Sequence, residues 1–145
     1  MFQSEELFMN KRILPFALAA LMLLATPLIG FAAGKASQEI ATATTHAQMA
    51  AAAADTATAV MHFHHVINCL VGVKSKHFDA NVGNPCKDMG NGALNDVKKT
   101  SLEHAKLMHA LVLAEQALHA DTLKATRQYA ARITEALTST DPDMN

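Results

Sequence analysis

The feature that most constrains the fold of this chain is the length of two segments that contain neither glycine nor proline. One extends from Gln38 to Val71, and the other from Leu94 to the residue before Pro142. Alanine, which has the highest helix propensity, recurs through both, whereas an all-β fold needs many turn residues. The whole chain has only 6 Gly and 4 Pro in 145 residues. We therefore predict an all-α fold.

The first of these segments predicts one long helix over residues 38–71. Its apolar residues recur at helical spacing, and Gly72 follows at the position where glycine commonly ends a helix. The first half of the helix is nearly all Ala and Thr, and such small side chains require close packing on another backbone. Residues 73–92, which are rich in Gly and Asn, predict a structured loop.

The second segment predicts two further helices. The first of them covers about 94–118, with Asn91 or Asn95 as its N-cap. Because Asp121 and Thr122 are typical capping residues, a new helix is predicted over 122–137. Together, the segments predict an antiparallel helical hairpin or bundle of three to four helices.

The cysteines add a covalent link to this arrangement. The chain has 2 Cys, at Cys69 and Cys86, and an even count in an oxidising compartment predicts a disulfide. The bond would staple the loop between the helices to the last turn of the first helix. On the chain-entropy model, closing such a loop contributes about 3 kcal/mol.

Residues 1–32 are predicted to be a secretory signal peptide. Lys11 and Arg12 precede a largely apolar run over 13–31, and cleavage is expected after Ala32. The remaining residues, 33–145, are expected to form a single helical domain.

Met9 offers an ordinary start for such a signal, so residues 1–8 are interpreted as an upstream extension. An uncleaved anchor is the alternative, since the apolar run is just long enough to span a bilayer. Both interpretations place the domain outside the cytoplasm, in the periplasm or secreted. No second long apolar run follows, so no stable membrane insertion is expected after cleavage.

Charge and motifs exclude several functions. Lys plus Arg number 12 and Asp plus Glu 13, a balance that gives no support for nucleic-acid binding. The sequence has no activated nucleophile, no carboxylate pair at an acid–base spacing and no phosphate-binding loop, so no enzyme activity is expected. The absence of a Cys-x-x-Cys-His motif excludes covalent haem attachment by the usual route.

The 8 histidines are the candidate ligand residues. If the helices before and after the loop pack antiparallel with Gly72 level with Ala93, histidines from the two helices face each other. An upper cluster then forms a few turns from the disulfide, and a lower cluster forms further along the pair. The upper cluster comprises His62, His65, His104 and Met108, and the lower one comprises His46, Met49, Glu115 and His119.

Two histidines, His64 and His109, are alternatives if the helix faces are rotated, and His77 in the loop is expected to be solvated. Imidazole suits copper, zinc, nickel and iron, thioether favours Cu(I), and the carboxylate favours Zn²⁺ or Cu²⁺. Copper binds most tightly in the divalent series, so copper is the first choice of metal and zinc the second.

Two short segments echo each other. His46-Ala47 and His109-Ala110 each lead into an Ala-rich run that ends in Ala-Asp-Thr, at 54–56 and at 120–122. The spacing from His to Asp differs between them, so the echo is a weak sign of an internal repeat.

One segment, Ser101-Leu102-Glu103-His104-Ala105-Lys106, is similar to segments of a known class of proteins. With the His-Ala dipeptides at His46, His109 and His119 and the restart at Asp121-Thr122-Leu123, it resembles the small His-rich metal-binding helical proteins of the bacterial periplasm. The resemblance implies a helical bundle that binds several divalent ions, copper especially. This chain departs from it by having fewer histidines and by the insert over residues 68–95.

The leading functional hypothesis is a protein that buffers or carries copper or a similar divalent ion, without catalysis. A b-type haem electron carrier is an alternative, with His62 or His65 and Met108 or His104 as axial ligands. A Soret band in the purified protein would separate the two. A helical stress or interaction module without a tight ligand is the third hypothesis, and pairing of the Ala-rich half with a second chain as a homodimer stays open.

Overall fold

The computed structural model describes residues 34–139, and all regular structure among them is helical. No strand occurs in this part of the chain, which confirms the predicted all-α class. The predicted signal peptide, and with it the upstream extension, lies outside the described residues. The elements are α1 (Lys35–Ala52), α2 (Thr56–Val71), the short 3₁₀ helix η1 (Ala80–Val82), α3 (Ala93–Asp96), α4 (Leu102–Ala117) and α5 (Leu123–Thr138).

The prediction of one helix over 38–71 is wrong, because the chain turns between α1 and α2. Asp55 caps α2: its carboxylate accepts hydrogen bonds from the backbone N–H of Thr58 at 2.7 Å and from the Thr58 hydroxyl at 3.0 Å. A capped helix start satisfies backbone N–H groups that a continuous helix would bond internally. The turn needs neither glycine nor proline, so α1 and α2 form a hairpin of their own.

The predicted helix over 94–118 is also interrupted. Only the four residues of α3 are helical at its start, and α4 begins anew after Ser101, whose Oγ accepts a hydrogen bond from the backbone N–H of His104 at 3.1 Å. The N-cap expected at Asn91 or Asn95 is therefore wrong. The break before α5 is confirmed, with Thr122 as its N-cap.

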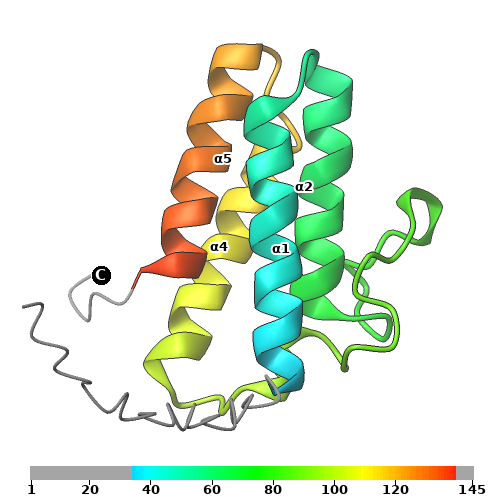
Figure 1. The fold of residues 1–145 in the computed structure, drawn as a ribbon, viewed down its shortest axis with the longest axis vertical. Coiled ribbons are helices and arrows are strands. Elements are labelled where there is room, and N and C mark those ends of the chain that lie inside the picture. Colours follow the sequence, from blue (N-terminus) through cyan, green and yellow to red (C-terminus); the bar gives the residue numbers. More distant parts are fainter. Residues whose placement is uncertain (1–33, 140–145) are drawn as a thin grey trace, which may run out of the picture. The chain divides into compact units, whose positions relative to one another are not determined.

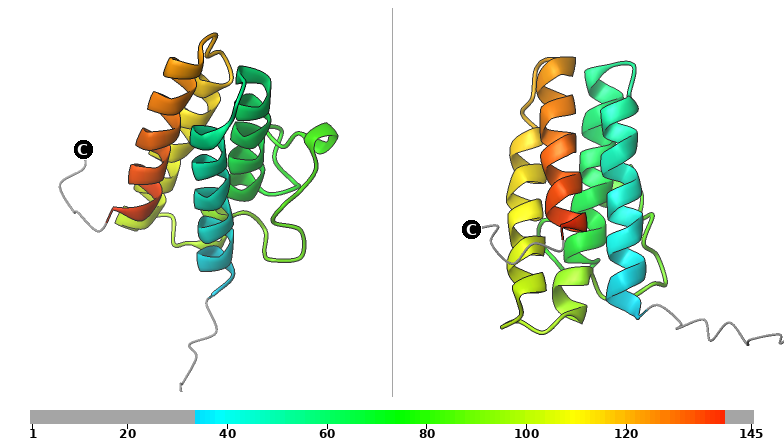
Figure 2. Two further views of the ribbon diagram at one scale, coloured as in Figure 1. Left: turned by 45° about the horizontal axis from the view of Figure 1, so that its top comes forward. Right: turned by 60° about the vertical axis from the view of Figure 1, so that its left-hand side comes forward.

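The four long helices lie side by side (Figures 1 and 2), with α1 in contact with α2 and α5, and α4 in contact with α5 and α2. On α1, the buried face consists of small residues; Ala43, Ala47 and Ala50 are all 0% exposed. As predicted from its composition, this helix packs closely on its neighbours. Larger buried side chains on the other helices, Phe63, Leu70, Leu107, Leu113 and Ile133, supply most of the apolar bulk of the core.

The end of α2 and the start of α3 cross at two glycines. Gly72, with φ 71°, ends α2 as predicted, and Gly92, with φ 100°, precedes α3. A Cβ at Gly72 would overlap the carbonyl oxygen of Asn91, and one at Gly92 would overlap the backbone of Val71 and Gly72. The close approach of the two backbones therefore requires glycine at both positions.

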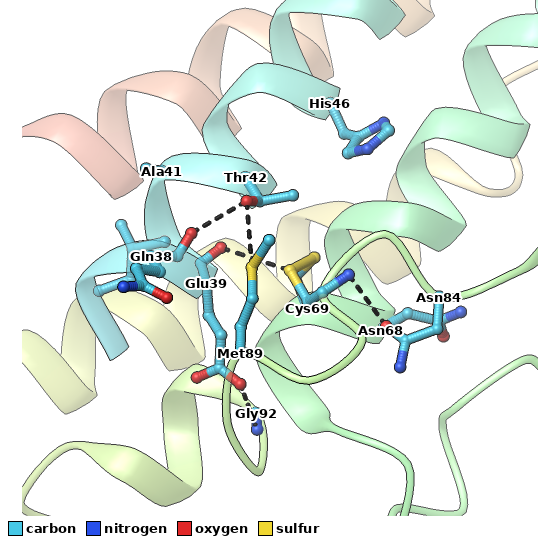
Figure 3. Close-up of a disulfide and its surroundings, with 12 residues drawn as sticks. Gln38, Glu39, Ala41, Thr42, His46, Asn68, Cys69, Asn84, Met89 and Gly92 are labelled. Carbon is cyan, nitrogen blue, oxygen red and sulfur yellow. Dashed lines mark hydrogen bonds between the residues drawn. A yellow bond between two sulfur atoms is a disulfide. The ribbon is translucent and has the colours of Figure 1, made fainter. Parts of the chain in front are cut away.

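The loop between these glycines is held to the helices by the predicted disulfide. Cys69 of α2 and Cys86 of the loop are bonded, and both are buried. Below the disulfide, Glu39 of α1 reaches the loop (Figure 3), where its Oε1 accepts a hydrogen bond from the backbone N–H of Gly92 at 2.7 Å. The later part of the loop is thus fixed at two points, to α2 through Cys86 and to α1 through Gly92.

Among residues 34–139, no helix combines the length and the apolar character needed to cross a bilayer.

Candidate metal centre

Three histidines meet between α1 and α2, and we call them the histidine triad: His46 of α1 with His62 and His65 of α2. One ring nitrogen of each lies within 4.8 Å of the others. The Nδ1 atoms of His46 and His62 are 3.1 Å apart, and the ring centroids of His46 and His65 are 4.6 Å apart. In the described part of the chain, this is the one group of three or more His, Cys, Asp or Glu residues placed to hold a metal ion.

The helix hairpin brings the triad together. His46 lies seven residues before Ala53 and His62 six residues after Thr56, so the two stand at about the same level on antiparallel helices. His62 and His65 are three residues apart on α2 and share a face of that helix. The ring of His46 points from α1 toward α2 (Figure 3).

The ring of His65 is oriented by a backbone carbonyl. Its Nε2 lies 2.6 Å from the carbonyl oxygen of Val82, a distance at which Nε2–H donates a hydrogen bond. Neutral imidazole carries one proton, so Nδ1 of His65 is left with a lone pair. This Nδ1 is buried and has no hydrogen-bond partner. A buried acceptor without a partner is costly in a folded protein, and a metal ion would satisfy it.

Val82 is itself held in place by Asn68, which lies one turn beyond His65 on α2 and is 1% exposed. The Asn68 amide nitrogen donates hydrogen bonds to the carbonyl oxygens of Asp79 and Gly83, both at 2.8 Å. Its amide oxygen accepts one from the backbone N–H of Asp79 at 2.9 Å. Asn68 therefore clamps the loop segment that carries the Val82 carbonyl.

The electrostatics of the site favour neutral rings at His46 and His62. Burial, with the nearby His65 and His62, lowers the pKa of His46 to about 4. Burial and the charge of His65 also lower the pKa of His62. Metal ions bind the unprotonated nitrogen of neutral imidazole, so these lowered pKa values keep ligand atoms available at neutral pH.

The separation of two triad nitrogens fits a metal ion bound by both imidazoles, and the third ring lies beside them. With metal–nitrogen distances of about 2.0–2.1 Å, two ligands of a tetrahedral ion lie about 3.3 Å apart, close to the His46–His62 separation. Binding at both Nδ1 atoms would replace the hydrogen bond between them, and the ring that carries its proton on Nδ1 would carry it on Nε2 instead. No fourth Cys, His, Asp or Glu joins the triad among residues 34–139, so at least one coordination position is left for water or another ligand.

The residues of the predicted upper cluster are divided in the structure. His62 and His65 belong to the triad, whereas His104 and Met108 of α4 line a separate cavity near the end of α2. The expected register paired α2 with the helix after the loop. In the structure, the histidines of α2 meet His46 of α1 instead, because the turn at Asp55 places α1 alongside α2.

The predicted lower cluster is divided as well. His46 belongs to the triad, Met49 is 44% exposed on α1, and His119 is exposed after α4. Glu115 lies with Oε1 at 2.8 Å from Nδ1 of His77, so the loop histidine expected to be solvated has an acidic partner.

Of the two alternative histidines, neither joins the triad. His64 has Nδ1 at 3.6 Å from a carboxylate oxygen of Asp79, and His109 is exposed on α4.

The sequence pattern names all three as candidate ligands but does not predict the grouping of His46 with His62 and His65. The signal that would have found it is Asp55 followed by Thr56, a capping pair of the same kind as Asp121 and Thr122. A helix start at that point makes the α1–α2 hairpin the first pairing to consider.

Comparison of the chain with protein-family models, with curated proteins and with solved structures found no match. The functional argument therefore depends on the residues and their geometry.

Proposed function

We propose that this chain is a metal-binding protein that buffers or carries copper or a similar divalent ion at the histidine triad, without catalysis. The supporting observation is the buried Nδ1 of His65, which has no partner and lies beside two further imidazoles, that of His62 on the same helix and that of His46 on the facing helix. A buried lone pair without a hydrogen-bond partner is rare in folded proteins, and a bound metal ion would account for it.

The choice of metal follows from the donor atoms. Three neutral imidazoles suit copper, zinc, nickel and iron, and the Irving–Williams order places copper first among divalent ions. The thioether of Met108 and the carboxylate of Glu115, which the sequence predicted as metal ligands, are not part of the triad. Copper stays the first proposal on the divalent order, and zinc is the second.

A role in carrying or buffering the ion, rather than holding it permanently, is favoured by the number of ligands. Structural zinc sites are closed by four protein ligands, whereas the triad supplies three. Its three residues are only partly buried, so an incoming donor from another molecule can reach the ion and exchange it.

The compartment belongs to the same proposal. A disulfide persists in oxidising compartments, and the predicted signal peptide directs the chain to the periplasm or outside the cell. The resemblance to small His-rich periplasmic proteins supports the same location. We include in the proposal the antiparallel bundle of four long helices, since such bundles hold metals between facing helices.

The test is metal analysis of the protein isolated from the periplasm of cells grown with copper. We expect about one equivalent of copper per chain, lost in His65→Ala and retained in His109→Ala, which removes an exposed histidine of α4. A wild-type protein without metal that also takes up neither copper nor zinc after isolation would contradict the proposal.

A further inference from the structure

A cavity of about 350 Å³ lies among the end of α2, the residues after it, α3 and the first turns of α4. Its floor is apolar and is formed by Val71, Leu94 and Leu111, which are 6%, 6% and 7% exposed. None of the triad histidines lines this cavity. It is therefore separate from the proposed metal centre.

The charged groups around this floor are basic. Lys74 and Lys99 line the cavity together with His77 and His104, and no Asp or Glu of the described residues lines it. Neither lysine side chain forms an ion pair within the described part of the chain. The formal charge of the whole chain is −1, so the cavity concentrates positive charge on a nearly neutral molecule.

The neutral polar groups of the wall are already occupied. The amide nitrogen of Asn95 donates a hydrogen bond to the carbonyl oxygen of Val71 at 3.0 Å, and Oγ of Ser75 accepts one from the backbone N–H of His77 at 3.1 Å. The His77 ring is held by Glu115, at 2.8 Å. These contacts order the wall, and Lys74 and Lys99 are the ammonium groups that it offers to a ligand, with the His104 ring beside them.

We propose that this cavity binds a small organic anion with an apolar body, of the class of medium-chain monocarboxylates. The floor removes the alkyl chain from water, and Lys74 and Lys99 interact with the carboxylate at the rim. A volume of about 350 Å³ is at the lower end for small-molecule sites, which matches one short chain and excludes large ligands. A neutral or cationic ligand would leave the lysine charges without a counterion.

The test uses octanoate as the probe, added to the purified oxidised protein and followed by amide chemical shifts. We expect saturable shifts centred on Leu94, Lys99 and Leu111, and at least about fivefold weaker binding of octan-1-ol, which has the same chain without the charge. Affinity for octanoate is expected to fall with added NaCl, because the lysines are at the rim and are screened by salt.

The variants separate this cavity from general surface charge. Lys74→Ala with Lys99→Ala is expected to weaken octanoate binding about tenfold. The charge-matched control is Lys124→Ala with Arg127→Ala, two exposed basic residues of α5, and it is expected to leave binding unchanged. His62→Ala is also expected to bind octanoate normally, so failure of the metal proposal would not affect this result.

Two outcomes would overturn the proposal. Octan-1-ol binding as tightly as octanoate would remove the role of the lysines. Equal losses in the two double variants would assign the effect to net charge rather than to the cavity.

Discussion

The orientation of the His65 ring is the residue-scale detail on which the metal centre depends. Its Nε2–H is committed to the Val82 carbonyl oxygen at 2.6 Å, which leaves Nδ1 as the free donor atom. Metal-binding histidines commonly have their second nitrogen hydrogen-bonded to a backbone carbonyl or a carboxylate in this way. The sequence predicted His65 as a ligand but gave no indication of which nitrogen, because the carbonyl comes from a loop residue without a distinctive side chain.

The lowered pKa of His46 predicts how stability depends on pH. The pKa is about 4 in the folded protein and 6.5 for an unperturbed histidine, so the unfolded chain binds a proton at this residue more readily. The contribution of neutral His46 to stability is therefore fully present above about pH 6.5 and is lost as pH falls toward about 4. The free energy of unfolding, measured by urea denaturation of the metal-free protein, is therefore expected to decrease as the pH is lowered from about 6.5 to about 4.

Substitution isolates the contribution of His46 from that of other titrating groups. His46→Gln is expected to flatten the pH dependence between about 6.5 and 4, whereas His109→Gln on the exposed face of α4 is expected to keep the wild-type slope. Identical slopes for His46→Gln and the wild type would contradict the burial of a neutral His46.

At the scale of the elements, the most consequential difference from the sequence prediction is the turn between α1 and α2. The absence of glycine and proline predicts one helix, but the side chain of Asp55 caps the start of a second helix without either residue. The echoed Ala-Asp-Thr segments mark the starts of two helices, α2 and α5, with Asp55 and Thr122 as their caps. The capping residues indicate where these helices begin, whereas the helical periodicity does not.

The loop segment 79–83 acts as a support for the triad, and Asn68 is the residue that fixes it. Asn68→Ala would leave partly buried backbone groups of Asp79 and Gly83 without their side-chain partner, so the free energy of unfolding is expected to fall by about 1–3 kcal/mol. With the Val82 carbonyl less firmly placed, metal affinity is expected to fall about 10-fold or more. Chemical denaturation and a competition titration with a chromophoric chelator measure the two effects.

The control for this loop variant is Asn81→Ala, which removes an exposed side chain whose amide nitrogen donates a hydrogen bond to the Asp79 carboxylate. It is expected to change both stability and metal affinity little. If Asn68→Ala lowered stability but left the affinity at the wild-type value, Asn68 would support the loop without supporting the metal site.

For the molecule as a whole, the sequence predicted the helical class, the disulfide and the close packing of the Ala-rich helix, because these follow from composition and spacing. Which helices are neighbours was not predicted, since it depends on where the chain turns. Because the turn between α1 and α2 was not predicted, the histidine partner of α2 was expected on α4, whereas it lies on α1. Long-range pairing is decided by such local breaks, which leave weak signals in a sequence where Ala is frequent everywhere.

The disulfide is expected to stabilise the whole domain. Cys69 and Cys86 are separated by 17 positions, so replacing both with serine is expected to lower the free energy of unfolding by about 3 kcal/mol on the chain-entropy model. The comparison is made by urea denaturation of the double variant and of the oxidised wild type. A difference below about 1 kcal/mol would show that the crossing at Gly72 and Gly92 and the Asn68 contacts hold the loop without the covalent bond.

The central claim is that a metal ion binds at one nitrogen of each triad histidine, and imidazole ¹⁵N NMR with added Zn²⁺ tests it most directly. Before Zn²⁺ is added, His65 is expected to show a protonated Nε2 and an unprotonated Nδ1. On addition of one equivalent, Nδ1 of His46, His62 and His65 is expected to shift to metal-bound values while Nε2 of His65 keeps its proton. Unchanged triad rings at one equivalent, or metal-bound shifts at His104 and His119 instead, would contradict the account.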